Sequence, residues 1–435
     1  PLWWDELVYG SLSKNFLTHT WDGTSLILKE MQIRPPILPL IWAGLMILNI
    51  PEAGSRFILG IIPSILSVFF VYLISKEIFN NKIAIISAFI FSIIWNYLFF
   101  SIRFLPDVPA TFFLLASIYF FIISIKNDFI PKHFFISIFL MSLSTLTRYN
   151  NGIFFLVYLF ILISTKKFYY KDKNFWFSGL FGLIPHFIFF FVNFIMYGNI
   201  FQALLGGGYV TLDQQMPFAW NILNYTQVYL GTIFLTFFIL GSVLILFKLV
   251  ISYDIIFKKS ELQGYILLIL IFLFIYSLFI FIMKGAEDRY LFPMAVTLSC
   301  FSGFGLFQTY NFVRKYNKLI AIILLISILF FGAYTQLKQA DQIIKAKSES
   351  YLQMKQGFEW IKYNTPKESV LLGSGIYPYA MYYSERKYIE TPQNISDFEK
   401  IKADYLVAHA FSTQPEYLNQ YLQDNQKNLE IVNAF

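Results

Sequence analysis

From residue 37 to residue 334 the chain alternates long apolar segments with short polar ones. Ten apolar segments predict membrane-spanning helices, at 56–75, 83–101, 108–125, 134–147, 152–164, 176–197, 225–247, 263–283, 290–309 and 319–334. Most of them are hydrophobic on every side, as helices that face lipid or a protein interior are. A proline at position 185 should bend the segment in which it lies. The pattern predicts a polytopic α-helical membrane protein.

The first 36 residues break this pattern. They contain two adjacent carboxylates, Asp5 and Glu6, and they close with Arg34-Pro35-Pro36, where the proline pair stops any helix. We interpret residues 1–36 as an irregular catalytic loop outside the bilayer. Because the chain starts in this polar segment with Pro1 rather than Met, we expect one more helix to precede it.

The segment that follows, 37–50, is apolar but shorter than the about 20 residues that a straight span requires. Pro39 and Pro51 lie at its two ends. We interpret it as an interfacial or re-entrant segment. The alternative, a short span, would invert the orientation of every later loop.

After the last span the composition becomes that of a soluble domain. The segment 336–362 predicts a helix, 404–408 a buried strand and 415–423 a second helix. We therefore predict a transmembrane helical domain at 37–334 and a small extracytoplasmic α/β domain at 335–435.

Composition and charge agree with a membrane protein. The chain is 57% hydrophobic and 14% charged, whereas soluble domains contain about 25% charged residues. One set of alternate loops contains fourteen basic residues, which are Lys76, Lys82, Lys126, Lys132, Lys166, Lys167, Lys171, Lys173, Lys248, Lys258, Lys259, Arg314, Lys315 and Lys318. The opposite short loops contain four, Arg103, Arg148, Lys284 and Arg289. This bias explains the net charge of +7 without nucleic acid. It predicts a multi-pass protein of the cell membrane, with the first loop and the C-terminal domain outside the cytoplasm.

Thiol and metal chemistry are not indicated. Cys300 is the single cysteine, so no disulfide can form within the chain. The four histidines are scattered, and the sequence contains neither a His-Glu-x-x-His nor an Asp-x-Asp motif. We therefore expect neither thiol chemistry nor a histidine metal site.

The predicted external loops collect carboxylates and arginines instead. They are Asp5, Glu6, Asp22, Arg34, Arg103, Asp107, Arg148, Glu287, Asp288 and Arg289. Ionisable groups at the edge of a membrane are costly and tend to be functional. Arginine forks suit a phosphate that a lipid tail anchors, and a carboxylate can take a proton from an incoming hydroxyl.

These residues also have plain structural interpretations. Asp5 and Glu6 suit the first turn of a helix, and Asp107 suits a helix cap. Arg34 can reach lipid headgroups from the interface. The run Gly206-Gly207-Gly208 lacks the strand and helix that a nucleotide-binding loop needs, so we interpret it as a flexible external loop.

Several motifs together resemble one family. They are Trp3-Trp4-Asp5-Glu6, Arg34-Pro35-Pro36, the Arg103–Asp107 turn and the late motif Asp288-Arg289-Tyr290-Leu291-Phe292-Pro293. They resemble the GT-C superfamily of membrane glycosyltransferases, and especially the branch that contains protein O-mannosyltransferases and the lipid A aminoarabinose transferase. The resemblance covers about residues 1–334, and the soluble tail is typical of many prokaryotic members.

The resemblance implies a GT-C fold and an inverting, metal-independent transfer. The sugar would move from a polyprenyl (dolichyl or undecaprenyl) phosphate to a hydroxyl acceptor on a protein, glycan or lipid. Asp5 would be the catalytic base with Glu6 beside it, and Asp107 would be the acidic residue of the second external loop. Arg34 stands where the family commonly has Lys and would contact the lipid phosphate, and Arg289 lies in the late motif.

Arg103 and Arg148 are further candidates to hold the donor, because they lie in the same set of external turns. Two other functions remain open. One is an oligosaccharyltransferase of the same superfamily, although its Trp-Trp-Asp-Tyr-Gly motif is missing from the C-terminal domain. The other is a transporter or flippase of lipid-linked sugars. Such a protein would be expected to have an internal repeat and charges near the membrane midplane. Frequent Asn, Lys, Ile and Phe indicate an AT-rich prokaryotic genome.

Overall fold

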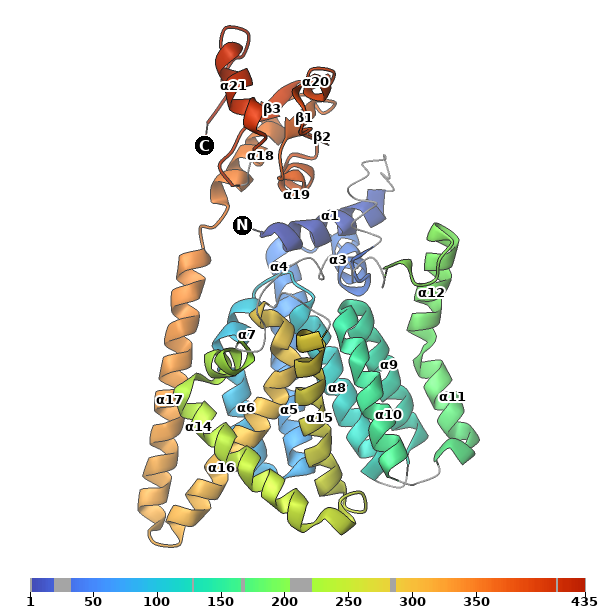
Figure 1. Cartoon of the computed structure of the whole chain (residues 1–435), viewed down its shortest axis with the longest axis vertical. Coiled ribbons are helices and arrows are strands. Elements are labelled where there is room, and N and C mark those ends of the chain that lie inside the picture. The colour runs from blue at the N-terminus through green and yellow to red at the C-terminus, as the bar shows by residue number, and fades with distance from the viewer. Residues whose placement is uncertain are drawn as a thin grey trace. The chain divides into compact units, whose positions relative to one another are not determined.

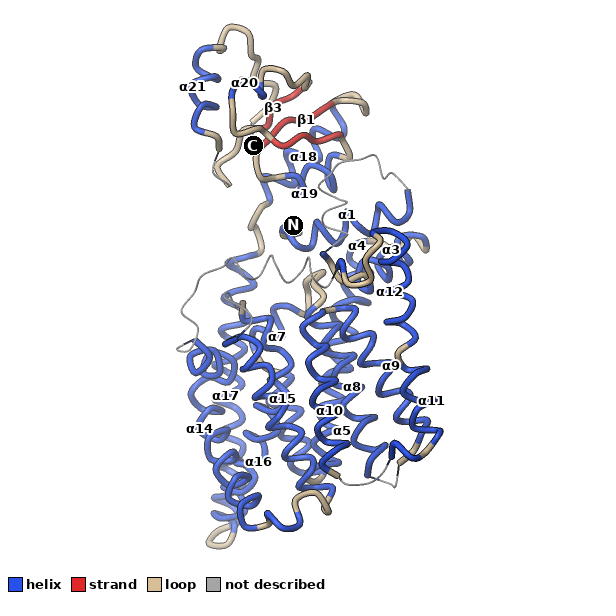
Figure 2. The backbone as a smooth tube through the Cα atoms, turned by 45° about the vertical axis from the view of Figure 1, so that its right-hand side comes forward, coloured by secondary structure: helices blue, strands red, loops and turns tan. Residues whose placement is uncertain are grey.

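The fold is described from a computed structural model that covers residues 2–18, 33–126, 129–165, 169–203, 221–281, 287–411 and 414–434 (Figure 1). Nearly all of its regular structure is helical, with one small sheet in the C-terminal part (Figure 2). The chain forms two compact units. The membrane unit comprises Met31–Ile41 and Asn49–Ile344, and the small unit comprises Pro1–Glu30, Trp42–Leu48 and Lys345–Phe435.

The helices of the membrane unit follow the apolar segments of the sequence. They are α4 (Glu52–Arg56), η1 (Phe57–Ile61), α5 (Ile62–Ile78), α6 (Asn81–Ser92), α7 (Trp95–Phe100), α8 (Asp107–Lys126), α9 (Pro131–Thr147), η2 (Tyr149–Ile153), α10 (Phe154–Ser164), η3 (Tyr169–Lys171), α11 (Lys173–Gly182), α12 (Ile184–Tyr197), α14 (Asn221–Ile251), η4 (Tyr253–Ile255), α15 (Ser260–Phe281), η5 (Asp288–Met294), α16 (Ala295–Arg314) and α17 (Lys318–Lys347). Helix α3 (Ile37–Ile47) has residues in both units. Helix α8 packs against α9 and α5, and α16 packs against α14 and α6 (Figure 1).

Fewer helices than expected are long enough to cross a membrane. Within the described residues, six helices meet this criterion by length and composition, and a seventh is the pair α11 and α12, which is bent by 48°. The bend lies beside Pro185, as predicted. The other three expected spans are shorter helices, because 83–101 is broken between α6 and α7, while α9 and α10 have 17 and 11 residues. The membrane protein is polytopic and helical as expected, but the predicted number of ten spans is not reached by this criterion.

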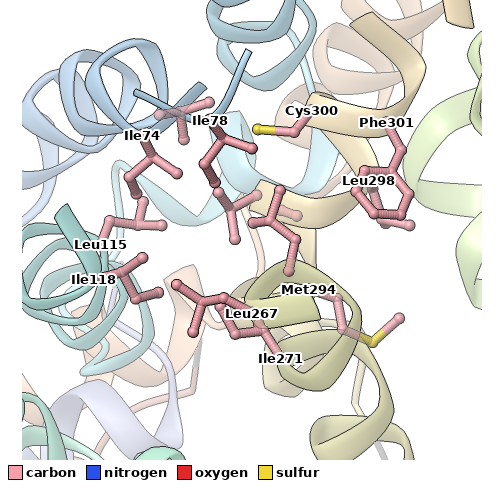
Figure 3. Packing of buried hydrophobic residues seen from close by; sticks show 14 of the residues in the cluster. Ile74, Ile78, Leu115, Ile118, Leu267, Ile271, Met294, Leu298, Cys300 and Phe301 are labelled. Atoms are coloured by element: carbon pink, nitrogen blue, oxygen red, sulfur yellow. The ribbon is translucent and has the colours of Figure 1, made fainter. Parts of the chain in front are cut away.

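One apolar core joins the long helices. Figure 3 shows Ile74 and Ile78 of α5 together with Leu115, Leu267 and Leu298 of three other helices. All five are nearly inaccessible to solvent. Lipid is as apolar as these side chains, so close packing rather than escape from water holds such helices together. This core supports the turns at the ends of the helices, where the charged residues lie.

The small unit combines the start of the chain with its end. Helix α1 (Trp4–Thr18) lies here with α18 (Leu352–Asn364), α19 (Tyr377–Tyr379), η6 (Ala380–Ser384), α20 (Ile395–Phe398) and α21 (Glu416–Asp424). Strands β1 (Val370–Gly373), β2 (Lys387–Glu390) and β3 (Tyr405–Val407) form a parallel sheet in the order β2-β1-β3, with Leu371 opposite both Tyr388 and Tyr405. The α/β nature of the C-terminal part is thus confirmed.

Two details of the expected organisation differ. Residues 4–18 are helical, so the interpretation of residues 1–36 as an irregular loop is wrong for that stretch. The compact units also do not follow the expected three-part division, because the start of the chain groups with the C-terminal part and α17 continues past residue 335. Neighbouring apolar and polar stretches do not reveal which distant segments will pack together.

Candidate active site

Asp107 and Arg148 form a buried ion pair in the membrane unit. Arg148 Nη1 lies 2.6 Å from Asp107 Oδ1, and the Asp107 side chain has no exposed surface. Asp107 is in the first turn of α8, where the helix dipole favours a negative charge. Arg148 follows the last residue of α9. The packing of α8 against α9 therefore brings together two residues that are 41 positions apart in sequence.

A third turn joins this pair through an aromatic ring. The guanidinium carbon of Arg148 lies 4.2 Å from the centre of the Tyr290 ring, and that of Arg289 lies 5.5 Å from it. Both arginines are thus within the range of a cation–π interaction with one ring. Arg289 Nε is also 2.6 Å from the exposed carboxylate of Glu287. The predicted turns at 103–107, 148–151 and 287–289 therefore lie together, as their assignment to one side of the membrane requires.

Arg103 and Arg34 lie near the same turns. Arg103 is buried, and its guanidinium carbon is 5.2 Å from the centre of the Phe99 ring. The backbone carbonyl of Arg34 accepts a hydrogen bond of 3.3 Å from Tyr149 Oη, and Tyr149 is the neighbour of Arg148. All four arginines that we predicted to hold the donor thus belong to one unit.

The sequence analysis missed two residues that build this region. Arg56 Nη1 donates a hydrogen bond of 2.8 Å to the carbonyl of Ile102, and its guanidinium stacks on Phe104 at 4.7 Å. It thereby holds the turn that contains Arg103. Tyr290 is the second, because its ring faces two arginines. Each carried a signal in the sequence, an arginine at the start of an apolar segment and an aromatic residue beside an arginine.

The predicted first-loop carboxylates belong to the small unit. Asp5 and Glu6 occupy the first turn of α1. Glu6 is fully buried, and its Oε2 accepts a hydrogen bond of 2.7 Å from the backbone N–H of Trp3. This is one half of a capping box, in which a side chain inside the helix satisfies the residue before it. Asp5 is partly exposed. Glu6 therefore has the structural role that the first-turn interpretation predicted, and the role of Asp5 in the reaction stays a prediction.

The remaining candidates fall into two groups, those outside the described residues and those with contacts of their own. Asp22 and the Gly206–Gly208 run lie outside the described residues. Glu287 pairs with Arg289, and Asp288 accepts a hydrogen bond at its backbone carbonyl from Tyr229 Oη. Within the part of the chain that the structure covers, no group of three or more His, Cys, Asp or Glu side chains is placed to hold a metal ion.

Comparisons with known proteins agree with this architecture. Residues 34–190 match the model of the dolichyl-phosphate-mannose-protein mannosyltransferase family. No curated protein sequence matches the chain significantly. Among solved structures, ArnT from Cupriavidus metallidurans bound to undecaprenyl phosphate is similar with a TM-score of 0.63 and 11% identity, over 92% of this chain and 84% of ArnT.

Archaeal structures are similar as well. The apo oligosaccharyltransferase of Archaeoglobus fulgidus matches with a TM-score of 0.62 and 14% identity, over 89% of this chain. The oligosaccharyltransferase AglB of the same organism, in complex with an inhibitory peptide and dolichol-phosphate, matches with a TM-score of 0.58 and 15% identity, over 91% of this chain. The chain spans only 60% and 64% of the length of these two proteins.

The fold is that of a multi-pass membrane protein of the GT-C type. Residues 34–190 are similar to the dolichyl-phosphate-mannose-protein mannosyltransferase family, and the fold over most of the chain is similar to those of ArnT and the archaeal oligosaccharyltransferases. The GT-C fold that the resemblance implied is thus confirmed, and the family match over residues 34–190 agrees with the resemblance.

Proposed function

We propose that the chain is an inverting glycosyltransferase that moves a sugar from a polyprenyl-phosphate donor to a hydroxyl acceptor on the extracytoplasmic face. The observation that carries the proposal is the meeting of Arg148 and Arg289 at the Tyr290 ring. Guanidinium groups bind phosphate with paired, directional hydrogen bonds, and they stay charged when partly buried. A phosphate at the end of a lipid can reach such a site only from the membrane, which suits turns at the ends of apolar helices.

In this proposal Asp107 is a positioning residue rather than a base. Its carboxylate is fully buried and already engaged with Arg148, so it holds that guanidinium in place. Arg148 and Arg289 contact the donor phosphate, and Arg103 and Arg34 add positive charge nearby. As the lipid phosphate leaves, these groups stabilise the negative charge that develops on it.

Asp5 is the proposed base. It takes the proton of the acceptor hydroxyl, whose oxygen then forms a bond with the anomeric carbon. The bond from that carbon to the phosphate oxygen breaks, and its electron pair leaves with the lipid phosphate. One displacement inverts the configuration of the sugar. Two facts about relatives support the donor class, since the ArnT structure contains undecaprenyl phosphate and the AglB structure contains dolichol-phosphate.

The test is transfer from radiolabelled polyprenyl-phosphate sugars in membranes that contain the wild-type protein or Asp5→Asn, with EDTA present. We expect transfer with inverted configuration by the wild type, and its loss in Asp5→Asn. Retained configuration would contradict the single displacement. Absence of transfer from every donor, with translocation of lipid-linked sugar instead, would support a flippase.

The similarity to archaeal oligosaccharyltransferases makes that activity the second candidate. It differs in two measurable ways, because it transfers a whole glycan to an asparagine amide and depends on a divalent cation. Loss of transfer on chelation, together with an alkali-stable glycan on asparagine, would favour it.

A further inference from the structure

Within the small unit, helix α1 is held at several points by a segment near the other end of the chain. This segment, Tyr377–Glu385, comprises α19, η6 and the residue after them, and it packs directly against α1 (Figure 1). Near the start of α1, the backbone N–H of Leu2 donates a hydrogen bond of 3.1 Å to Tyr383 Oη. Near its end, Lys14 Nζ donates to the carbonyl of Tyr382 at 2.9 Å.

The middle of α1 fits the segment sterically. A Cβ atom at Gly10 would lie 2.6 Å from Cε2 of Tyr382 and 3.0 Å from Cη2 of Trp42. Real Cβ atoms do not approach other atoms as closely as 2.6 Å, so the Tyr382 ring would have to move. A glycine inside a helix is less favourable for stability than an alanine. We attribute the glycine at position 10 to the close approach of the Tyr382 ring.

Glu385 adds an electrostatic contact. Its Oε1 lies 3.0 Å from Lys14 Nζ and 2.9 Å from Lys362 Nζ. Burial raises the pKa of the Glu385 carboxyl, but the two lysines outweigh burial and hold the pKa below its usual range. All three side chains are partly exposed, so each pair alone contributes little. Together they join α1 and α18 to the end of the segment.

The segment also contacts the residue beside the proposed base. The Trp4 ring lies edge-on to Tyr377 at 5.1 Å and to Tyr379 at 6.4 Å between centroids. Burial, neighbouring tyrosines and Glu6 raise the pKa of Tyr379, so its phenol stays neutral next to the helix start. The residue before Asp5, Trp4, is thus held by ring contacts with the C-terminal part of the chain.

We infer that the segment Tyr377–Glu385 is a positioning clamp for α1, and that Gly10, Lys14 and Glu385 are positioning residues for the reaction. The inference rests on the proposed function, because that proposal makes Asp5 the base and α1 the helix that carries it. The C-terminal part of the chain then contributes to catalysis by holding the helix that carries the base.

A size exchange tests the clamp. The methyl group of Gly10→Ala should displace α1 and lower kcat by about ten-fold or more, since a base misplaced by about 1 Å can cost about 100-fold in rate. Donor KM should stay unchanged, because the proposed donor residues lie in the other unit. Tyr382→Ala makes room for that methyl group, so Gly10→Ala/Tyr382→Ala should regain most of the lost kcat. Ser11→Ala, the next residue on α1, is the control that adds no atom and should behave as the wild type.

A change in the amount of folded protein would not produce this result. Less folded protein would lower the rate by the same factor at every pH, whereas a displaced base also shifts the acidic limb of the kcat profile against pH. No loss in Gly10→Ala, or no recovery in the double variant, would overturn the clamp.

Crosslinking measures the docking of α1 without using activity. Lys14 and Lys362 both contact the same carboxylate oxygen, so a short amine-reactive crosslinker should join them in the full-length wild-type protein. We expect the yield of the Lys14–Lys362 peptide in mass spectra to fall in Gly10→Ala and to recover in Gly10→Ala/Tyr382→Ala. A strong crosslink without transfer from any donor would support the clamp and contradict the proposed function. Active enzyme without the crosslink would contradict the clamp but not the proposed function.

Discussion

Arg148 and Asp107 meet across the ends of two helices, with Arg148 Nη1 2.6 Å from Asp107 Oδ1 and the aspartate fully buried. A buried ion pair often adds little net stability, but the removal of one partner leaves the other charge buried and uncompensated. This pair therefore has more influence on the position of Arg148 than its net energy indicates. The buried charge that a substitution would leave uncompensated also makes the pair sensitive to substitution.

Asp107→Asn should destabilise the membrane unit. It keeps the size of the side chain but removes its charge, and the loss of one partner of a buried pair costs about 3–5 kcal/mol. We expect a clear fall in the apparent melting temperature of the protein in detergent micelles. Glu52→Gln is the control, because Glu52 pairs with Arg56 at 3.0 Å at an exposed site. An equal effect of the two variants would contradict the buried-pair interpretation.

Tyr290 should matter for donor binding through its ring rather than its hydroxyl. Tyr290→Leu removes the face that Arg148 and Arg289 share, and a cation–π contact contributes about 0.5–2 kcal/mol. That energy corresponds to a donor Kd that rises about 2- to 30-fold, measurable by titration with a polyprenyl phosphate. Tyr290→Phe keeps the ring and should bind as the wild type does. A larger effect of Tyr290→Phe would assign the contribution to the hydroxyl instead.

The adjacent carboxylates Asp5 and Glu6 should respond differently. Asp5→Asn removes the proposed base, and general base catalysis contributes about 10²–10⁴-fold to a rate. Glu6→Gln should retain activity, because glutamine can also complete a capping box. Glu6→Ala loses the cap and should cost about 0.3–1.5 kcal/mol of stability. Transfer rates and melting temperatures of the three variants separate the two roles, and an inactive Glu6→Gln would return Glu6 to the reaction.

Glu385 should make the stability of the small unit depend on pH. Its pKa is lower in the folded protein than the ordinary value of 4.5, so the folded state binds its proton less tightly than the unfolded state does. The stabilisation is fully present above pH 4.5 and is lost as the pH falls through the lowered value. Melting temperatures of the wild type and Glu385→Gln should differ at neutral pH and converge in acid. Curves that stay parallel across this range would show that the carboxylate makes no such contribution.

Gly60 should tolerate no side chain. A Cβ atom there would lie 2.1 Å from the backbone carbonyl oxygen of Ser101, in the turn that leads to Arg103. Backbone cannot rotate away as a side chain can, so Gly60→Ala should destabilise the protein by about 1–3 kcal/mol, the usual cost of overpacking. Gly44→Ala is the matched control, because nothing lies within 4 Å of its added methyl group. Equal melting temperatures of the two variants would contradict this contact.

Some irregular features of the fold were readable in the sequence and others were not. The bend beside Pro185 was predicted, because proline lacks the N–H that a helix needs. No proline or glycine in the sequence indicates the break between α6 and α7. Distant residues hold Trp95 there, since its backbone N–H donates to Gln336 Oε1 at 2.9 Å and its side-chain Nε1 donates to the carbonyl of Val228 at 2.7 Å.

By itself the sequence determined the membrane class, most helix positions and the set of charged turns, because these depend on local composition and on the cost of placing charge in lipid. It also carried motifs that resemble those of the GT-C superfamily. Only the tertiary structure decided that Asp107 pairs with Arg148, that Tyr290 faces two arginines, and that α1 packs with the C-terminal part of the chain. These contacts join residues up to several hundred positions apart. Their partners are chosen by helix packing and shape, which no local pattern of the chain records.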